Sequence, residues 1–342
     1  MVAAGESVSS RPQALDMPWL SSALHQALHT MQGHAILVSA PPGAGAFELS
    51  LSIAQGWLCH APSEGGPCGQ CASCHWVASR SHPDLLCLLP EALQQSLGWR
   101  SEDETQGSEE KASKSKPSQE IKVDAVRAAV SFVQTTSSSG RAKVVLIHPA
   151  EAMNQVAANA LLKTLEEPAG VARFVLSCTA PEALLPTVRS RCQVLPIALP
   201  TTEQAHRWLS DRGVSRPDVL LAATGGLPLA ARDWADEGMT AALWEGLPQC
   251  VMRGDAGPLA AWPVPRWVDA LQKLCHDGMC LAVHAPPRFF SAAVVPQGAS
   301  LQKLSSWARE LQRVAKYAEH PWGQPLAVAA LLQQACQALQ PA

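Results

Sequence analysis

Four cysteines in the first quarter of the chain have the spacing of a metal site. Cys59, Cys68, Cys71 and Cys74 form the pattern C-x₈-C-x₂-C-x₂-C. Thiolates bind Zn²⁺ in closed tetrahedral sites, and a site that uses all four leaves no position for a reacting water. The spacing therefore predicts a structural zinc module over residues 59–74. The alternatives are four free thiols or an iron–sulfur cluster, although the C-x₃-C-P ending of bacterial ferredoxins is missing.

A glycine-rich stretch resembles a phosphate-binding loop that lacks its chemical groups. Residues 40–47 read APPGAGAF, between an apolar run and a helical pattern. In this context backbone N–H groups cradle phosphates. A working loop reads G-x-x-x-x-G-K-[ST], but this chain keeps only Gly43 and Gly45 and has Ala46 and Phe47 in place of the Lys and the hydroxyl residue. We expect that no ATP binds productively, and weak occupancy of an adenosine pocket stays open.

Composition narrows the class of protein. The chain has 342 residues, of which 47% are hydrophobic and 16% charged, so two or three domains with sizeable cores are expected. A net charge of −3 without a basic run argues against strong DNA binding by the chain alone. The first residues carry no secretory signal, and no apolar stretch is long enough for a membrane span. We therefore expect a cytoplasmic protein, in which clustered cysteines indicate metal binding rather than disulfides.

The elements that position these residues alternate between strand and helix patterns in the first half of the chain. Helical patterns cover residues 47–58, 123–134 and 155–167. Such alternation predicts an α/β fold with a mostly parallel sheet and helices on both faces. A polar stretch at residues 99–120 reads as a flexible surface insertion. The predicted strands are Ala35–Ser39, Asp84–Leu89, Lys143–His148, Arg173–Ser177 and Gln193–Ile197.

Strand patterns end near residue 200, and helical patterns follow. Thr201, with an acid and Gln204 in the next turn, predicts the N-cap of a helix. We expect an α/β domain over residues 1–199, a small helical domain over 200–240 and an all-helical domain over 241–342.

A further segment indicates a family. The stretch NALLKTLEEP at residues 159–168 precedes FVLSCT at 174–179 and SRC at 190–192. Together with the cysteine cluster and the loop remnant, these residues resemble the bacterial DNA polymerase III clamp-loader family, over roughly the first two thirds of the chain. The resemblance implies a RecA-like AAA+ P-loop domain that carries the zinc module, then a helical lid domain and an all-helical collar domain for oligomerisation.

Departures from the family's ATPase pattern resemble its non-ATPase delta-prime members. His148-Pro149 stands where active members have an Asp-Glu pair for Mg²⁺ and water activation. Pro228 stands where they place a sensing arginine in the lid. With the degenerate loop, these losses imply no intrinsic ATPase activity. An ATP-binding gamma/tau-like subunit is the alternative, and a zinc module that binds nucleic acid directly is another.

By the same resemblance, the chain retains one catalytic element of the family. Ser190-Arg191-Cys192 corresponds to the motif that projects an arginine finger into the ATP site of a neighbouring subunit. A planar, permanently charged guanidinium suits that role, and a local surface salt bridge is the alternative. The implied partners are gamma/tau and delta subunits in a hetero-pentamer. Through this complex they include the sliding clamp and primed DNA during replication.

Overall fold

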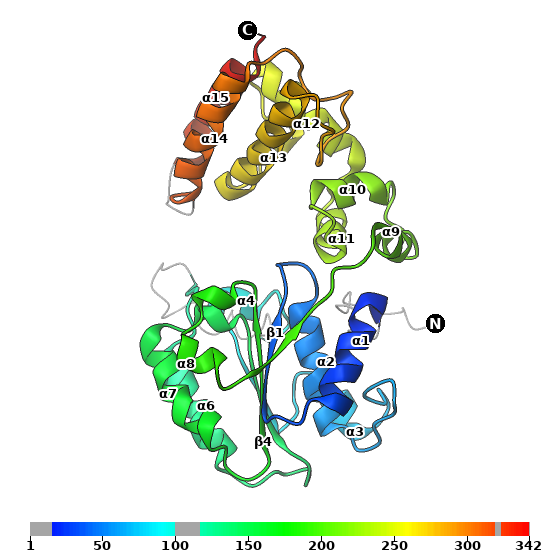
Figure 1. Cartoon of the computed structure of the whole chain (residues 1–342), viewed down its shortest axis with the longest axis vertical. Helices are drawn as coiled ribbons and strands as arrows, with labels where there is room; N and C mark the ends of the chain where they lie inside the picture. The colour runs from blue at the N-terminus through cyan, green and yellow to red at the C-terminus, as the bar shows by residue number, and fades with distance from the viewer. Residues whose placement is uncertain (1–15, 100–116, 319–322, 342) are drawn as a thin grey trace, which may run out of the picture. The chain divides into compact units, whose positions relative to one another are not determined.

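A five-stranded parallel sheet forms the centre of the first part of the chain (Figure 1). The structure, a computed structural model, describes residues 16–99, 117–318 and 323–341. Its contacts divide the chain into two units, residues 1–200 and 201–342. The sheet belongs to the first unit, and its strand order is β2-β3-β4-β1-β5. The strands are β1 (Ala35–Ser39), β2 (Leu85–Leu88), β3 (Lys143–Ile147), β4 (Ala172–Cys178) and β5 (Gln193–Pro196).

The apolar runs of the sequence explain where these strands lie. Strands β1, β3 and β4 occupy the middle of the sheet, where both faces are covered, and they are buried almost throughout. Every pair is parallel, so each connection must cross over the sheet. Each observed strand begins and ends within one residue of the predicted one. The predicted parallel α/β architecture is therefore confirmed.

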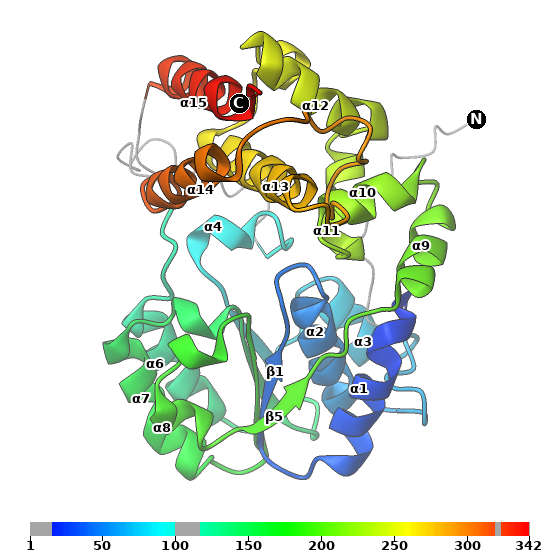
Figure 2. The same cartoon turned by 45° about the horizontal axis from the view of Figure 1, so that its top comes forward.

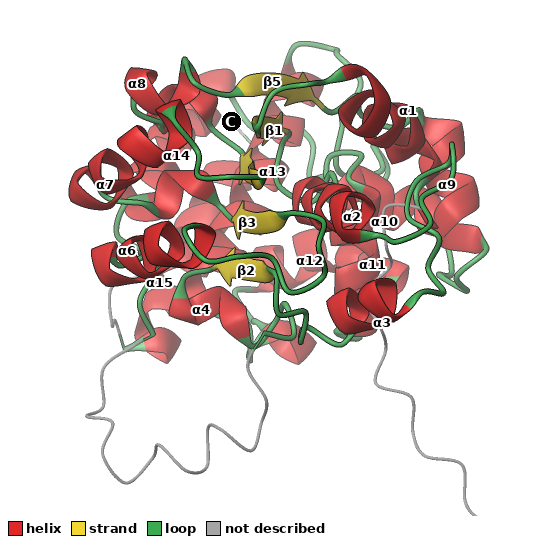
Figure 3. Ribbon diagram, turned by 90° about the horizontal axis from the view of Figure 1, so that it is seen from below, coloured by secondary structure: helices red, strands yellow, loops and turns green. Residues whose placement is uncertain are grey.

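Helices cover both faces of this sheet (Figure 3). On one face, α2 is buried along its whole length, which suits a helix packed directly on the strands. On the other face, the core includes Val126 and Leu161 from two helices and Phe174 from β4. The first face carries α1 (Ser21–His25), the π-helix η3 (Gln26–Thr30), α2 (Ala46–Leu58) and α3 (Ala72–Ala78). The second carries α6 (Val123–Val133), α7 (Gln155–Glu166) and α8 (Pro186–Arg189), while the short α4 (Glu91–Gln94) follows β2.

All regular structure that is described in the second unit is helical, and α13, α14 and α15 pack against one another in it (Figure 2). Thr201 caps the first of these helices as predicted: its hydroxyl accepts from the Gln204 N–H at 3.2 Å, and the Gln204 side chain accepts from the Thr201 N–H. The helices are α9 (Thr202–Ser210), α10 (Pro217–Ala223), α11 (Pro228–Asp236), α12 (Ala241–Arg253), α13 (Val264–Ala282), α14 (Leu301–Ala315) and α15 (Gln324–Leu339).

A buried carboxylate organises the loop between α13 and α14. Asp277 is fully buried on the core face of α13. It accepts from the backbone N–H groups of Arg288, Phe289 and Phe290 at 2.7–2.8 Å. Hydrogen bonds of this kind satisfy a buried charge that would otherwise be costly. Asp277 thus fixes a long loop that has no regular structure of its own.

Two further predictions from the sequence concern the insertion and the boundary between the helical domains. The predicted insertion at residues 99–120 falls mostly on 100–116, outside the described residues. At its ends, Trp99 packs within the first unit and Ile121 forms a bridge to Met153. The division of the helical part into a lid and a collar at residue 240 stays a prediction. None of the described helices has the length and apolarity that a membrane crossing needs.

Candidate functional site

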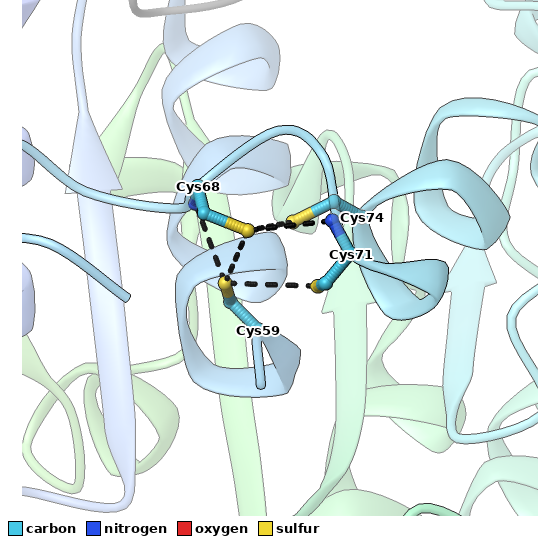
Figure 4. A group of neighbouring side chains, drawn as sticks. All are labelled: Cys59, Cys68, Cys71 and Cys74. Carbon is cyan, nitrogen blue, oxygen red and sulfur yellow. Dashed lines mark hydrogen bonds between the residues drawn. The ribbon is translucent and has the colours of Figure 1, made fainter. Parts of the chain in front are cut away.

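The four predicted metal ligands lie together at the end of α2 (Figure 4). Cys59 directly follows α2, Cys71 caps α3 and Cys74 lies within it, while Cys68 comes from the loop between these helices. All four sulfur atoms lie within 4.8 Å of one another. These cysteines could hold a metal ion.

The distances fit a tetrahedral thiolate site. Metal–sulfur bonds of about 2.3 Å in a regular tetrahedron place the sulfurs about 3.8 Å apart. The Sγ atom of Cys59 lies 3.4 Å from that of Cys68 and 3.9 Å from that of Cys71, and the Cys68 and Cys74 sulfurs are 4.0 Å apart. These separations exclude disulfides, whose sulfurs are about 2.05 Å apart. The donor set and its geometry therefore fit Zn²⁺.

Backbone groups already favour thiolates at two of the four positions. Burial would raise the pKa of Cys71, but hydrogen bonds from the backbone of His60 and Cys74 lower it to about 6. Backbone hydrogen bonds likewise lower the pKa of Cys68, while burial raises the pKa values of Cys59 and Cys74. A metal ion would supply the charge that stabilises all four thiolates.

A hydrogen-bond chain ties this module to the sheet. The hydroxyl of Ser73, between two of the cysteines, donates to the Leu58 carbonyl at 2.8 Å and lies 2.6 Å from His82 Nε2. The other ring nitrogen, Nδ1 of His82, accepts from the Asp84 N–H at 3.0 Å. This contact fixes the proton of a neutral His82 on Nε2, which then donates to Ser73. The sequence patterns did not identify this bridge between Ser73, His82 and Asp84.

The glycine-rich loop has glycines at two positions where its backbone is left-handed. Gly43 and Gly45 have φ values of 76° and 100°, in the left-handed region that favours glycine, and Gly45 caps α2. The carbonyl of Ala44 accepts from the indole N–H of Trp19 at 3.1 Å. Ala46 is buried at the first position of the helix. The loop thus joins β1 to α2 without offering an ammonium group at its end.

Aromatic rings pack on one another beside the glycine-rich loop. Phe47, in the place of the hydroxyl ligand, has its ring centroid 5.0 Å from that of His148, which follows β3. The Trp99 ring lies 5.9 Å from Phe47 in an edge-to-face arrangement. Nδ1 of His148 lies 2.7 Å from the hydroxyl of Ser177 on β4. The two positions that correspond, by the resemblance, to Mg²⁺-binding positions of active members therefore carry rings that pack on each other.

Arg191 lies between α8 and the edge strand β5 and is held by its own chain. One guanidinium nitrogen donates to the Thr187 carbonyl at 2.7 Å, and another pairs with the carboxylate of Glu166, the last residue of α7. The Arg191 side chain is 28% exposed. Its Nε has no hydrogen-bond partner among the described residues. The guanidinium is thus partly accessible and partly neutralised.

The two residues beside Arg191, Ser190 and Cys192, make contacts within the folded chain. The exposed Ser190 hydroxyl donates to the Thr187 carbonyl at 3.2 Å. Cys192 packs against the core, and burial raises the pKa of its thiol to about 12, so it is protonated and suited to packing rather than nucleophilic chemistry. In the second unit, Pro228 is the first residue of α11, where proline fits because no N–H is needed.

The structure also shows neighbours of the candidate site residues that the sequence motifs did not identify. Trp99 falls inside the stretch predicted as an insertion, yet it packs on Phe47 and under the guanidinium of Arg80. Glu166 belongs to the LEEP segment but was not assigned to Arg191. An acid at the end of a helix before a predicted arginine site is a signal, although it does not specify the pair.

Comparison with known proteins agrees with this architecture. The family described as "DNA polymerase III, delta subunit" matches residues 18–201. A DNA polymerase III subunit delta' of Pseudomonas aeruginosa is 38% identical over 210 residues, which cover 60% of this chain and 57% of that protein. The Escherichia coli subunit delta' is 32% identical, with 78% of this chain and 72% of that protein covered.

A third relative carries a different subunit name. The DNA polymerase III subunit tau of Escherichia coli is 29% identical over 176 residues, which are 52% of this chain and 23% of that protein. The match to the Pseudomonas aeruginosa protein spans little more than half of that protein's length. The family match and the similarity to the Escherichia coli delta' subunit over most of both chains agree, and the chain therefore belongs to the delta' family of DNA polymerase III, among the clamp-loader AAA+ proteins.

Proposed function

We propose that the chain acts as a non-ATPase subunit of a bacterial clamp loader. It joins gamma/tau and delta subunits in a hetero-pentamer that loads the sliding clamp onto primed DNA, and it supplies Arg191 in trans to a neighbouring ATP site. The observation that carries this proposal is the packing of Phe47 on His148, combined with a partly accessible Arg191. The chain's own site is filled, while a group useful to another site remains.

The loss of ATP hydrolysis follows from the groups that are replaced. Hydrogen bonds to charged groups contribute roughly 1.5–3 kcal/mol each, and Ala46 supplies none to a phosphate. Phe47 and His148 provide neither the hydroxyl nor the carboxylate that binds Mg²⁺ in NTPases. Binding ATP with its metal would also require the packed rings of Phe47, His148 and Trp99 to separate. Each of these effects opposes productive binding.

An arginine finger in trans needs a guanidinium that can leave its resting partner. Arg191 precedes β5, which is an edge strand of the sheet, so no further strand of the described sheet covers it. The pair with Glu166 is partly solvent-exposed and therefore weak. A γ-phosphoryl group carries more negative charge than one carboxylate and accepts two parallel hydrogen bonds from arginine. A neighbour's nucleotide can therefore compete successfully for Arg191.

The cysteine module serves this function as a structural zinc site. A closed four-thiolate site has no open position for catalysis, and its role is to hold the segment between α2 and α3 in one conformation. From α3, Ser73 is linked through His82 to Asp84, the residue directly before β2. Zinc thus stabilises the α/β unit that presents Arg191.

The decisive experiment replaces Arg191 in a reconstituted loader. Arg191→Ala should leave assembly intact, as measured by gel filtration, and lower clamp-stimulated ATPase and loading at least tenfold, because fingers in other NTPases contribute about 10³–10⁵ in rate. Arg189→Ala is the matched control, since Arg189 is an exposed arginine two residues away. Normal ATPase in the Arg191→Ala complex would refute the assignment.

Nucleotide binding by the isolated chain separates this function from that of an ATPase subunit. The similarity to subunit tau and the left-handed glycines of the loop, Gly43 and Gly45, are the observations that favour the alternative. Equilibrium binding of labelled ATP to the full chain should be absent in the micromolar range. A Kd of a few micromolar, about −7 to −8 kcal/mol, would support the ATPase alternative.

A further inference from the structure

A pocket with two unpaired arginines lies at the edge of the sheet opposite the degenerate loop. Its volume is about 500 Å³. Arg141 and Ala142 directly precede β3, and Arg173 is the second residue of β4, so both guanidinium groups come from the edge where these strands begin. The loop at residues 40–46 instead follows the end of β1, which runs parallel to β4. The two features are therefore separated by the length of the strands.

The walls of the pocket come from the covering helices. Leu28 and His29 belong to η3, and Gly56 and Trp57 lie in the last turn of α2. Strand alternation places Arg173 on the face opposite Phe174, whose side chain belongs to the core packed under α6 and α7. Arg173 therefore lies on the α2 face, where its guanidinium carbon is 5.1 Å from the centroid of the Trp57 ring. The ring provides an apolar wall and fixes the cation.

The charge in this pocket is not balanced by its lining residues. The lining contains Arg141, Arg173 and His29, and no aspartate or glutamate. Within the part of the chain that the structure describes, no hydrogen bond or ion pair to a carboxylate is present for Arg141 or Arg173. Burial, and after it the charge of Arg141, lower the pKa of Arg173, which agrees with two cations close together in a partly dry place. A half-buried cation without a partner is unfavourable unless an anion joins it.

We propose that this pocket binds a phosphoryl group through Arg141 and Arg173. The planar fork of arginine matches the oxygens of a phosphate, and two forks can hold a dianion. The volume exceeds that of a single inorganic phosphate and lies in the range of small-molecule sites, and the Trp57 ring offers a surface for an attached planar group. The source of the phosphoryl group is either a free anion such as pyrophosphate or a nucleotide. This site is independent of the proposed arginine finger.

Calorimetric titration of the full chain with pyrophosphate, dAMP and deoxyadenosine tests the proposal. We expect binding of a phosphorylated ligand with a Kd of about 1 mM or tighter at low salt and no binding of deoxyadenosine. Arg141→Gln and Arg173→Gln should each weaken it at least tenfold. Arg127→Gln is the control, because Arg127 is an exposed arginine on α6 that pairs with Asp124. Tighter binding of dAMP than of pyrophosphate would identify a nucleotide site, and the reverse would identify a free anion.

Two results would overturn the inference. One is the absence of binding by both phosphorylated ligands, and the other is binding that survives both arginine substitutions, which would point to the loop at residues 40–46. Because Arg173 is partly buried, circular dichroism and thermal unfolding check that its variant folds. Arg141 is exposed, so its variant tests the site even if the Arg173 variant is destabilised.

Discussion

Asp84 is predicted to be a major contributor to the stability of the α/β unit. Its carboxylate is fully buried directly before β2. It accepts from Lys143 Nζ at 3.0 Å, from the hydroxyl of Ser137 at 3.0 Å, and from the N–H groups of Ser138 and Ser139 at 2.9 and 2.7 Å. Asp84→Ala would leave Lys143, which is 9% exposed, without its counter-charge and two amides without an acceptor.

The expected decrease in the free energy of unfolding of Asp84→Ala follows from the contacts that the substitution removes. Removing one partner of a buried ion pair costs about 3–5 kcal/mol, whereas water can replace the carboxylate at the amides of the exposed Ser138 and the half-buried Ser139. Water entry and loop adjustment offset part of this, so we expect Asp84→Ala to lower the free energy of unfolding by about 4 kcal/mol. At about 2–4 °C per kcal/mol for a unit of this size, Tm falls by roughly 8–16 °C.

Calorimetry of the full chain measures this loss of stability. Hydrogen exchange of the peptides that contain β2 and β3 tests whether the loss lies in the α/β unit. Ser137→Ala removes one hydroxyl donor and is the control, with an expected loss of about 1 kcal/mol. The double variant Asp84→Ala/Lys143→Met should be more stable than the sum of the two single losses predicts. A loss below about 1 kcal/mol for Asp84→Ala would refute the reasoning.

The same contacts predict that the α/β unit loses stability at acidic pH. Burial alone would raise the pKa of Asp84, but the hydrogen bonds from Ser138 and Ser139 and the Lys143 ammonium hold it well below its ordinary value of 3.8. A lowered carboxyl pKa stabilises the fold fully above pH 3.8, and this stabilisation is lost as the pH falls from there toward the folded-state pKa. Below pH 4, unfolding free energy should therefore change less steeply with pH in Asp84→Asn than in the unchanged chain. Equal slopes would exclude Asp84 as the titrating group.

Three further predictions concern the proposed sites. Stripping metal with a chelator should lower the Tm of the α/β unit and release close to one equivalent of zinc, and Cys74→Ser should reproduce the loss; iron, or less than half an equivalent of zinc, would contradict the assignment. Ala46→Lys combined with Phe47→Thr should not restore ATP binding, because His148 still replaces the acidic pair; micromolar binding by this variant would show otherwise. Glu166→Gln should free Arg191 and leave or raise the ATPase of the reconstituted loader, and a fall as large as that of Arg191→Ala would mean that Glu166 positions the finger.

Continuous apolar runs made the sheet predictable. The residues of β1 and β3 are buried on both faces, so their hydrophobicity alone marks strands bounded by turns. The cysteine site was equally predictable from the sequence, since two of the three gaps between its cysteines are two residues long. Local pattern therefore predicted the elements and the ligands that are close in sequence.

Contacts between distant segments could not be derived in the same way. Asp84 and Lys143 meet because Leu85 pairs with Val144, a register that only the folded sheet defines. Trp99 follows α4 in a stretch whose polar composition conceals its packing on Phe47. Asp277 gave a usable signal, because it is an acid on the apolar face of α13, but its partners lie in a loop eleven to thirteen residues away.

The packing of aromatic rings beside the degenerate loop explains why the lysine, the hydroxyl residue and the acidic pair are absent together. A loop that lacked only its lysine would keep a polar pocket, and one substitution could restore it. Here Phe47 packs on His148, and His148 in turn contacts Ser177 on β4, so each replacement fits the others. Aromatic pairs contribute about 0.5–1.5 kcal/mol beyond the area they bury, and restoring one polar group would place it among rings without partners. The packed site thus favours the fold of this unit over nucleotide chemistry. Arg191 pairs with Glu166 and lies outside that packing, so the role in trans that we propose for it does not depend on the loop.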